Sequence, residues 1–274
     1  MLLAPDPHDE RLARPVTGVD QDGREVTLRV VTETPISVWL NGREIVTLMT
    51  IGDHPELLAL GYLMNQNILA RDDVVDEIVF DEETAAVVVR CEAVAPFEAK
   101  MKKRIRTSGC AQGTVFGDAF SAFEKVRLPK AELRTSWLRL LTKAINTTPS
   151  LYLEAGAIHG CVLCHRDRPL AYMEDVGRHN AVDKIAGWMR RENVDPADKI
   201  FYTTGRLTSE MVMKCAMMGV PILVSRSGFT AWGVELARQV GLTLVGRARG
   251  HRFTVLSGAQ NVVRDAASGV GEAA

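Results

Sequence analysis

The residue best suited to chemistry is Cys110, which stands in a run of glycines and small polar residues. Gly109 and Gly113 flank it and break any helix or strand pattern, so the sequence predicts a loop. Positive charge lowers the pKa of a thiol and favours the thiolate, the form that accepts and passes on sulfur. The alternative is an exposed loop cysteine with no chemical role. Four cations stand just before it: Lys102, Lys103, Arg104 and Arg106.

A second group of thiols, Cys161 and Cys164 followed by His165, has the spacing of two zinc ligands. The pair lies in an apolar segment that predicts a buried strand, where a separation of three residues points the sulfurs to opposite faces. No second pair of cysteines or histidines completes a metal site, so we interpret both as buried structural cysteines and predict no metal. Five cysteines without a signal peptide also argue against a disulfide framework.

Three segments that follow predicted strands have the composition of anion-binding loops. Two of them combine glycine with hydroxyl residues, and the free backbone N–H groups of such a turn suit a phosphate. They are expected at the same edge of a parallel sheet, where open α/β folds bind ligands. The third is rich in arginine, which offers paired donors to phosphate, although it could equally be a solvated loop. The candidate binding residues are Gly205, Arg206, Ser209, Ser225, Arg247, Ala248, Arg249, Gly250, His251 and Arg252.

The segment from Glu174 to Asn180 gathers two carboxylates, a cation, an imidazole and an amide immediately before a predicted helix. Capping of that helix by Asn180 or its neighbours, with the acidic pair at its positive end, accounts for one or two of these residues. The whole set is better explained by a ligand pocket or a polar junction between domains. No acid or base role can be assigned within it.

The apolar pattern around these motifs predicts an α/β protein with two domains. Residues 16–119 form a small α+β domain, with a hairpin at Asn41-Gly42, that ends in the Cys110 loop. Residues 120–257 alternate strands with helices and predict a largely parallel sheet. A disordered leader at 1–15 and a flexible tail at 258–274 complete the chain. The elements predicted in the second domain are helices at 137–147 and 183–190, one ending at Met218 and one at 231–240, and strands at 156–163, 200–204, 221–225 and 242–245.

Charge and hydropathy narrow the class of protein. With 33 Lys and Arg against 34 Asp and Glu, the formal net charge is −1, so no global field favours nucleic acid or a membrane surface. The N-terminus lacks an apolar signal segment, and no apolar run is long enough to span a bilayer. We therefore expect a soluble, cytoplasmic protein that binds neither nucleic acid nor membrane, and whose anionic ligands meet a local patch of cations.

Taken together, these segments resemble the formate dehydrogenase accessory sulfurtransferase family, the FdhD type, over residues 33–256. The resemblance implies that Cys110 takes persulfide sulfur from a cysteine desulfurase and delivers it to the molybdenum bis-guanine-dinucleotide cofactor, for insertion into the catalytic subunit of formate dehydrogenase. It also implies a homodimer, a C-terminal three-layer domain similar to the cytidine deaminase fold, and a cofactor-binding turn at Arg247–Arg252. The motifs that carry it are Glu33-Thr34-Pro35, Ala59-Leu60-Gly61-Tyr62-Leu63, Thr107-Ser108-Gly109-Cys110, the Glu174–Asn180 segment and Gly219-Val220-Pro221-Ile222-Leu223.

Two departures bear on mechanism. Some members of the family carry a second cysteine three residues after the first, whereas Gly113 stands there in this chain, which leaves one thiol in the loop. The zinc ligands of true deaminases are also absent from the matching motifs. Two alternatives remain: a cofactor-binding chaperone without sulfur chemistry, and a zinc-dependent nucleoside deaminase.

Overall fold

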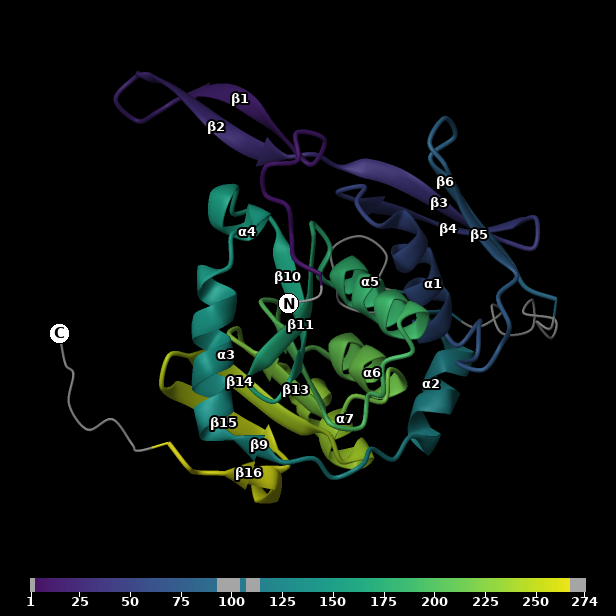
Figure 1. Cartoon of the computed structure of the whole chain (residues 1–274), viewed down its shortest axis with the longest axis vertical. Helices are drawn as coiled ribbons and strands as arrows, with labels where there is room; N and C mark the ends of the chain where they lie inside the picture. Colours follow the sequence, from purple (N-terminus) through teal and green to yellow (C-terminus); the bar gives the residue numbers. More distant parts are fainter. Residues whose placement is uncertain (1–2, 93–103, 107–113, 267–274) are drawn as a thin grey trace.

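The computed structural model of the chain describes residues 3–92, 104–106 and 114–266. Its architecture is mixed α/β, as predicted, with a six-stranded sheet at the centre and smaller sheets around it (Figure 1). Cys110 lies outside the described residues. Within them, no helix is long and apolar enough to cross a membrane.

The central sheet is mixed, with the strand order β11-β10-β12-β13-β14-β15. Strands β12, β13 and β14 pair in parallel, and the remaining neighbours pair antiparallel. The sequence predicted the parallel part from its alternation of strands and helices. The strands are β10 (His159–His165), β11 (Arg168–Asp175), β12 (Lys199–Thr203), β13 (Ile222–Ser225), β14 (Thr243–Arg249) and β15 (Arg252–Ser257).

Helices cover both faces of this sheet, because side chains alternate between the faces along each strand. Phe201 of β12 points into the apolar cluster beneath α5, α6 and α7, whereas its neighbour Tyr202 points into the cluster beneath α3. The helices are α3 (Thr135–Thr147), α5 (Arg178–Arg191), α6 (Ser209–Met217) and α7 (Ala231–Val240). Helix α5 begins five residues before the predicted position, so Arg178 and His179 lie in its first turn.

A second, four-stranded sheet comes from the N-terminal part of the chain, in the order β4-β3-β6-β5. The predicted hairpin is confirmed: Asn41 and Gly42 join β3 to β4 with φ of 50° and 80°, the left-handed values that a tight turn requires. Helix α1 buries Leu60 and Leu63 against this sheet. The elements are β3 (Thr34–Leu40), β4 (Arg43–Thr50), α1 (Pro55–Asn65), β5 (Glu77–Asp81) and β6 (Ala86–Arg90).

Two glycines allow α1 to lie directly against α5. A Cβ atom on Gly61 would stand 1.7 Å from the carbonyl oxygen of Asp183, and one on Gly187 would stand 2.0 Å from that of Leu57. A side chain at either position would force the helices apart. The N-terminal sheet is thereby fixed to the central one, with the end of β4 beside the start of α5.

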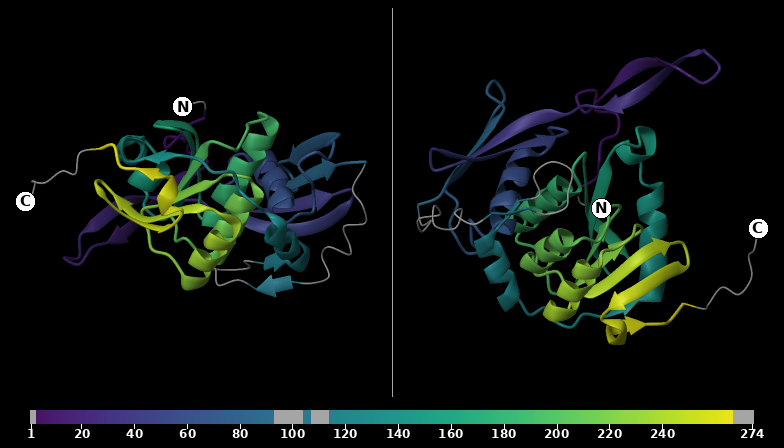
Figure 2. Two further views of the ribbon diagram at one scale, coloured as in Figure 1. Left: turned by 90° about the horizontal axis from the view of Figure 1, so that it is seen from below. Right: turned by 180° about the vertical axis from the view of Figure 1, so that it is seen from behind.

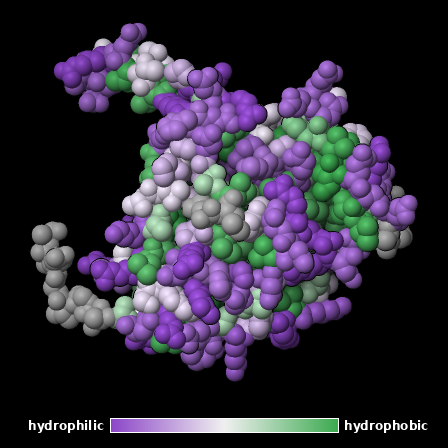
Figure 3. Space-filling view, in the orientation of Figure 1, coloured by the Kyte–Doolittle hydropathy of each residue, from purple (hydrophilic) through white to green (hydrophobic). Residues whose placement is uncertain are grey.

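The prediction of a disordered leader at residues 1–15 needs correction, because the structure places residues 3–15 against the body of the protein. The N–H of Leu3 donates to the Leu170 carbonyl at 3.2 Å, and the Tyr172 N–H donates to Leu3 at 3.0 Å, which covers the open edge of β11. Strands β1 (Ala13–Val19) and β2 (Glu25–Val31) then pair as an arm that extends from the body (Figures 1 and 2). The arm's visible surface is mixed, with hydrophilic residues at its tip and apolar ones behind them (Figure 3), and Val19 and Leu28 are among its exposed residues.

The C-terminal part of the sheet also differs from the prediction. The strand expected to be the last one continues to Arg249, and β15 follows it after a two-residue turn. Residues 258–266, predicted as part of a flexible tail, are ordered because Val262 is buried in a short strand that pairs with β9. The remaining elements are β7 (Arg104–Arg106), β8 (Thr114–Phe116), α2 (Gly117–Lys125), β9 (Leu133–Arg134), α4 (Leu151–Glu154), η1 (Ala259–Asn261) and β16 (Val262–Val263).

Candidate functional site

Four strands of the central sheet end at the same edge. Because β10 is antiparallel to both β11 and β12, those two strands run in the same direction, and β13 and β14 continue it. The strand order brings together the loops after β11, β12 and β13 and the turn after β14. We call this the carboxyl edge, and open α/β sheets bind ligands at this position.

The two predicted glycine-hydroxyl loops meet at the carboxyl edge. Ser225 Oγ donates to the Gly205 carbonyl oxygen at 2.6 Å and accepts from the Ser227 N–H at 2.9 Å. The Gly205 N–H donates to Thr203 Oγ1 at 3.1 Å. Arg206 is exposed beside them, and Ser209 is the buried first residue of α6. The expectation that these loops share one edge of the sheet is confirmed.

The arginine-rich segment lies against the second of these loops. The Arg247 N–H donates to the Ser227 carbonyl at 2.9 Å, and the Arg247 guanidinium lies 5.5 Å from the centre of the Phe229 ring. Gly250 and His251 form the turn between β14 and β15, and the arginines at 247, 249 and 252 are exposed. Ala248 differs from its neighbours, since its side chain is buried in the core beneath α3.

The Glu174–Asn180 segment divides into two groups, and the first is a closed polar junction. Asp175 accepts from Thr50 Oγ1 and Lys184 Nζ, both at 2.5 Å, and from Asn180 Nδ2 at 2.9 Å. Lys184 is fully buried and also pairs with Asp53. Burial acts to lower the pKa of Lys184, but Asp175 and Asp53 outweigh it and raise that pKa. This junction joins β4 to α5 and uses its polar groups internally.

Two further charged groups inside the molecule are also partnered. The Glu174 carboxylate accepts the N–H groups of Leu151 and Tyr152 at 2.8 and 2.9 Å, and so caps α4. Burial nevertheless raises the pKa of Glu174 to about 7. Asp183 accepts from Lys214 and from Asn65, each at 2.7 Å, and this pair ties α5 to both α6 and α1.

The second group of the segment, Arg178 and His179, faces the carboxyl edge instead. Nε2 of His179 lies 3.1 Å from Oε2 of Glu210 in the first turn of α6. Its Nδ1 and the hydroxyl of the neighbouring Thr208 are buried without a hydrogen-bond partner among the described residues. Burial, with Lys214 and Arg178 nearby, lowers the pKa of His179 well below its usual value. Buried polar atoms without partners are uncommon and mark places where a ligand or water binds.

The edge has the electrostatics of an anion site. Helices α5 and α6 both begin there, and their capping residues, Gly177 and Thr208, form no side-chain cap hydrogen bond. The first N–H groups of each helix carry partial positive charge. Burial and the cations Arg178 and Arg206 also lower the pKa of His159, which starts β10 at the same edge. A phosphate-bearing ligand would complete these groups.

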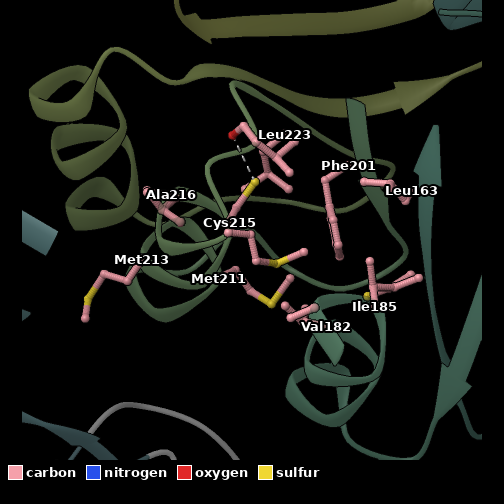
Figure 4. Close-up of a cluster of buried hydrophobic side chains, with 14 of the residues drawn as sticks. Leu163, Val182, Ile185, Phe201, Met211, Met213, Cys215, Ala216 and Leu223 are labelled. Atoms are coloured by element: carbon pink, nitrogen blue, oxygen red, sulfur yellow. Dashed lines mark hydrogen bonds between the residues drawn. The ribbon is translucent and has the colours of Figure 1, made fainter. Parts of the chain in front are cut away.

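The described cysteines are all buried. Cys161 belongs to the core beneath α5 and α6, and Cys164 to the core beneath α3, so the predicted opposite orientation is confirmed and the two cannot share a metal. Burial raises the pKa of Cys161 to about 12. Figure 4 shows Cys215 among the methionines of α6, where its thiol donates to the Val220 carbonyl at 3.5 Å. No group of three potential metal ligands occurs in the part of the chain that the structure describes.

Sequence reasoning missed several residues of these sites. Lys184 and Lys214 were not singled out, although each stands among apolar residues of a predicted helix, which is a sign of a buried, paired charge. Thr203 and Tyr202 were also missed, because they lie in a segment that the sequence identifies only as an apolar strand. Nothing local in the sequence distinguishes the Tyr202 hydroxyl, which has no partner in the described structure, from that of Tyr172, which bonds to Ser150.

Comparison with known proteins supplies the family. Residues 31–263 match the model of the FdhD/NarQ family, which covers most of the chain. The chain belongs to the FdhD/NarQ family. Curated relatives include the sulfur carrier protein FdhD of Bacillus subtilis strain 168, 30% identical over 233 residues, which are 83% of this chain and 87% of the relative. That of Bacillus pumilus is 29% identical over 240 residues, covering 86% of this chain and 91% of the relative.

A solved structure agrees with this assignment. The crystal structure of a candidate formate dehydrogenase accessory protein from Desulfotalea psychrophila superposes with a TM-score of 0.74 at 28% sequence identity. The match covers 92% of this chain and 98% of that one. Both the central sheet and the N-terminal sheet therefore belong to the fold shared within the FdhD/NarQ family.

Proposed function

We propose that this protein is a sulfur carrier that serves formate dehydrogenase. In this proposal, the thiolate of Cys110 attacks the outer sulfur of a persulfide on a cysteine desulfurase. The S–S bond of the desulfurase breaks, its cysteine leaves as a thiolate, and Cys110 becomes the persulfide. The acceptor is the molybdenum bis-guanine-dinucleotide cofactor, which binds at the carboxyl edge before it enters the catalytic subunit of formate dehydrogenase.

The observation that carries the proposal is a set of buried polar groups at the carboxyl edge that lack hydrogen-bond partners among the described residues. The chain also belongs to the FdhD/NarQ family. Thr208 and His179 lie where two helices begin, and the exposed arginines at 206, 247 and 249 lie on the segments that follow β12 and end β14 at the same edge. All of these groups suit the phosphates of a nucleotide. We assign the cofactor to Gly205, Arg206, Ser209, Ser225 and the Arg247–Arg252 hairpin, of which Ala248 contributes its backbone.

The cysteine inventory supports Cys110 as the carrier. The other four thiols are buried, and three of them have a pKa raised by burial, which disfavours the nucleophilic thiolate. The proposal also includes a cytoplasmic location, a homodimer and a C-terminal domain similar to the cytidine deaminase fold. The opposite orientation of Cys161 and Cys164 speaks against the zinc-dependent deaminase alternative.

The other alternative is a chaperone that binds the cofactor without sulfur chemistry. The carboxyl edge suits such a chaperone equally well, and one experiment distinguishes it from a sulfur carrier. The protein is incubated with a cysteine desulfurase and cysteine, and its peptides are analysed by mass spectrometry. We expect one added sulfur atom on the Cys110 peptide and none on the peptides of Cys161, Cys164 or Cys215. Absence of the adduct, together with full formate dehydrogenase maturation by a Cys110→Ala variant, would establish the chaperone instead.

A further inference from the structure

The carboxyl edge has a second side, beneath α3, which carries tyrosines of the central strands. Tyr202 of β12 and Tyr172 of β11 lie in the same row on this face, because both pair with Val162 of the strand between them. Both rings are buried, with 1% and 2% of their surfaces exposed. The Tyr172 hydroxyl is hydrogen-bonded to Ser150. Tyr202 has no hydrogen-bond partner for its hydroxyl among the described residues.

Arg226 and Arg249 lie close enough to this unpartnered hydroxyl to act on its pKa electrostatically. Arg226 follows β13, and its guanidinium lies 5.3 Å from the centre of the Tyr152 ring and makes a long 3.5 Å contact with Asn146 Oδ1. Arg249 Nε donates to the Arg226 carbonyl oxygen at 3.4 Å. Neither arginine pairs with a carboxylate within the described ranges. Two cations and a buried hydroxyl therefore lie on the same side of the edge, and neither cation is neutralised by a carboxylate of the described residues.

The charge state of Tyr202 fits a donor role. Burial raises its pKa to about 12, although Arg226 and Arg249 act in the opposite direction. The phenol therefore keeps its proton at neutral pH and can donate a hydrogen bond. A buried hydroxyl without a partner destabilises the folded chain, so a ligand oxygen that accepts from it recovers free energy.

We propose that Tyr202, Arg226 and Arg249 form a phosphate-binding subsite on the α3 side of the carboxyl edge. The subsite takes a phosphate group of a nucleotide-bearing ligand, with Arg226 leaving its weak contact to Asn146 to engage the phosphate. The assignment of a nucleotide rests on the proposed function, whereas the phosphate chemistry rests on the three side chains. A free phosphate ion has the same chemistry, and the experiment separates the two sources.

The test uses the full chain and isothermal titration with guanosine diphosphate or with inorganic phosphate. Tyr202→Phe removes only the unpartnered hydroxyl, and Arg226→Gln removes one cation. We expect each variant to weaken guanosine diphosphate binding by about tenfold, while the free energy of unfolding of ligand-free Tyr202→Phe stays unchanged or rises. Tyr172→Phe is the matched control: it should lower the free energy of unfolding and leave the affinity unchanged.

The outcomes separate this subsite from the proposed function. Wild-type binding that neither variant weakens would overturn the subsite alone. A wild-type chain that binds neither probe would overturn both the subsite and the assignment of a cofactor to the edge, while sulfur loading of Cys110 would still test the carrier role. Binding of inorganic phosphate as tight as that of guanosine diphosphate, with the same loss in Tyr202→Phe, would retain the subsite and reject the nucleotide as its source.

Discussion

The junction around Lys184 and the carboxyl edge use buried polar groups in opposite ways. In the junction around Lys184, the Asp175 carboxylate and the lysine ammonium are each held by several partners. At the carboxyl edge, His179 in the first turn of α5 and Thr208 at the start of α6 keep buried polar atoms without partners in the described structure. Fully partnered networks rigidify a fold, whereas unpartnered groups lower its stability unless a ligand completes them. The difference distinguishes a structural network from a candidate binding site, although Asp175 and His179 lie within one short segment of sequence.

The largest effect is expected from breaking the partnered junction. Lys184→Met leaves the buried Asp175 carboxylate without its counter-ion, and removal of one partner from a buried pair costs about 3–5 kcal/mol. Urea denaturation measures this loss in the free energy of unfolding. Lys143→Met on the exposed side of α3 is the control, and it should change stability by less than about 0.5 kcal/mol. Equal stability of the two variants would contradict the structural role of the junction.

Glu174, which lies next to the junction, should make the stability of the protein depend on pH. Its pKa rises from 4.5 in the unfolded chain to about 7 in the folded one, so the unfolded chain loses its proton first as pH increases. The stabilising contribution is therefore complete below pH 4.5 and is lost as pH rises to 7, by up to about 3 kcal/mol.

The Glu174→Gln variant has no ionisable group at this position, so its comparison with the wild type isolates the pH-dependent contribution of the Glu174 carboxyl group to stability. The difference in unfolding free energy between Glu174→Gln and the wild type should shift in favour of the variant as pH rises from 4.5 to 7. Urea titrations at several pH values give this difference directly. A difference that stays constant over the range would show that Glu174 does not titrate as described.

Two buried threonines at the carboxyl edge give a closer comparison. Thr203 accepts the N–H of Gly205 through its hydroxyl, so Thr203→Val leaves that donor without a partner and should cost about 1–3 kcal/mol. Thermal and urea unfolding of the variant measure the loss. Unchanged stability of Thr203→Val would show that the hydrogen bond between Thr203 and Gly205 does not stabilise the fold.

The smallest change in stability is expected for Thr208→Val, which removes a hydroxyl that has no partner in the described structure. The free energy of unfolding should stay within about 0.5 kcal/mol of the wild type or increase, because no hydrogen bond is lost. Affinity for guanosine diphosphate should fall, since the hydroxyl faces the proposed ligand. A Thr208→Val variant that is strongly destabilised but binds guanosine diphosphate normally would contradict this account, because Thr208 would then be structural rather than ligand-binding.

Local chemistry explains what the sequence could predict. The hairpin at Asn41-Gly42 follows from turn residues alone, and the meeting of the Gly205 and Ser225 loops follows from parallel strand topology. The orientation of Cys161 and Cys164 follows from the period of a strand. Each of these needs only a short stretch of sequence or a general rule of sheets.

The features that were missed depend on contacts between distant parts of the chain. Lys184 pairs with Asp53, 131 residues earlier, and nothing near either residue indicates the other. Val262 was assigned to a flexible tail by its small, polar neighbours, yet pairing with β9 orders it. The leader was assigned by composition in the same way, whereas Leu3 joins the edge of β11 through backbone hydrogen bonds that any residue can make.

The central claim, that Cys110 carries sulfur to a ligand held at the carboxyl edge, is tested most directly by following labelled sulfur. The protein is loaded by a cysteine desulfurase with radioactive cysteine sulfur and mixed with formate dehydrogenase that awaits maturation. The account predicts that the wild type loads and transfers label, that Cys110→Ser fails to load, and that Thr208→Val loads normally but transfers slowly. Transfer of label by Cys110→Ser at the wild-type rate would contradict it.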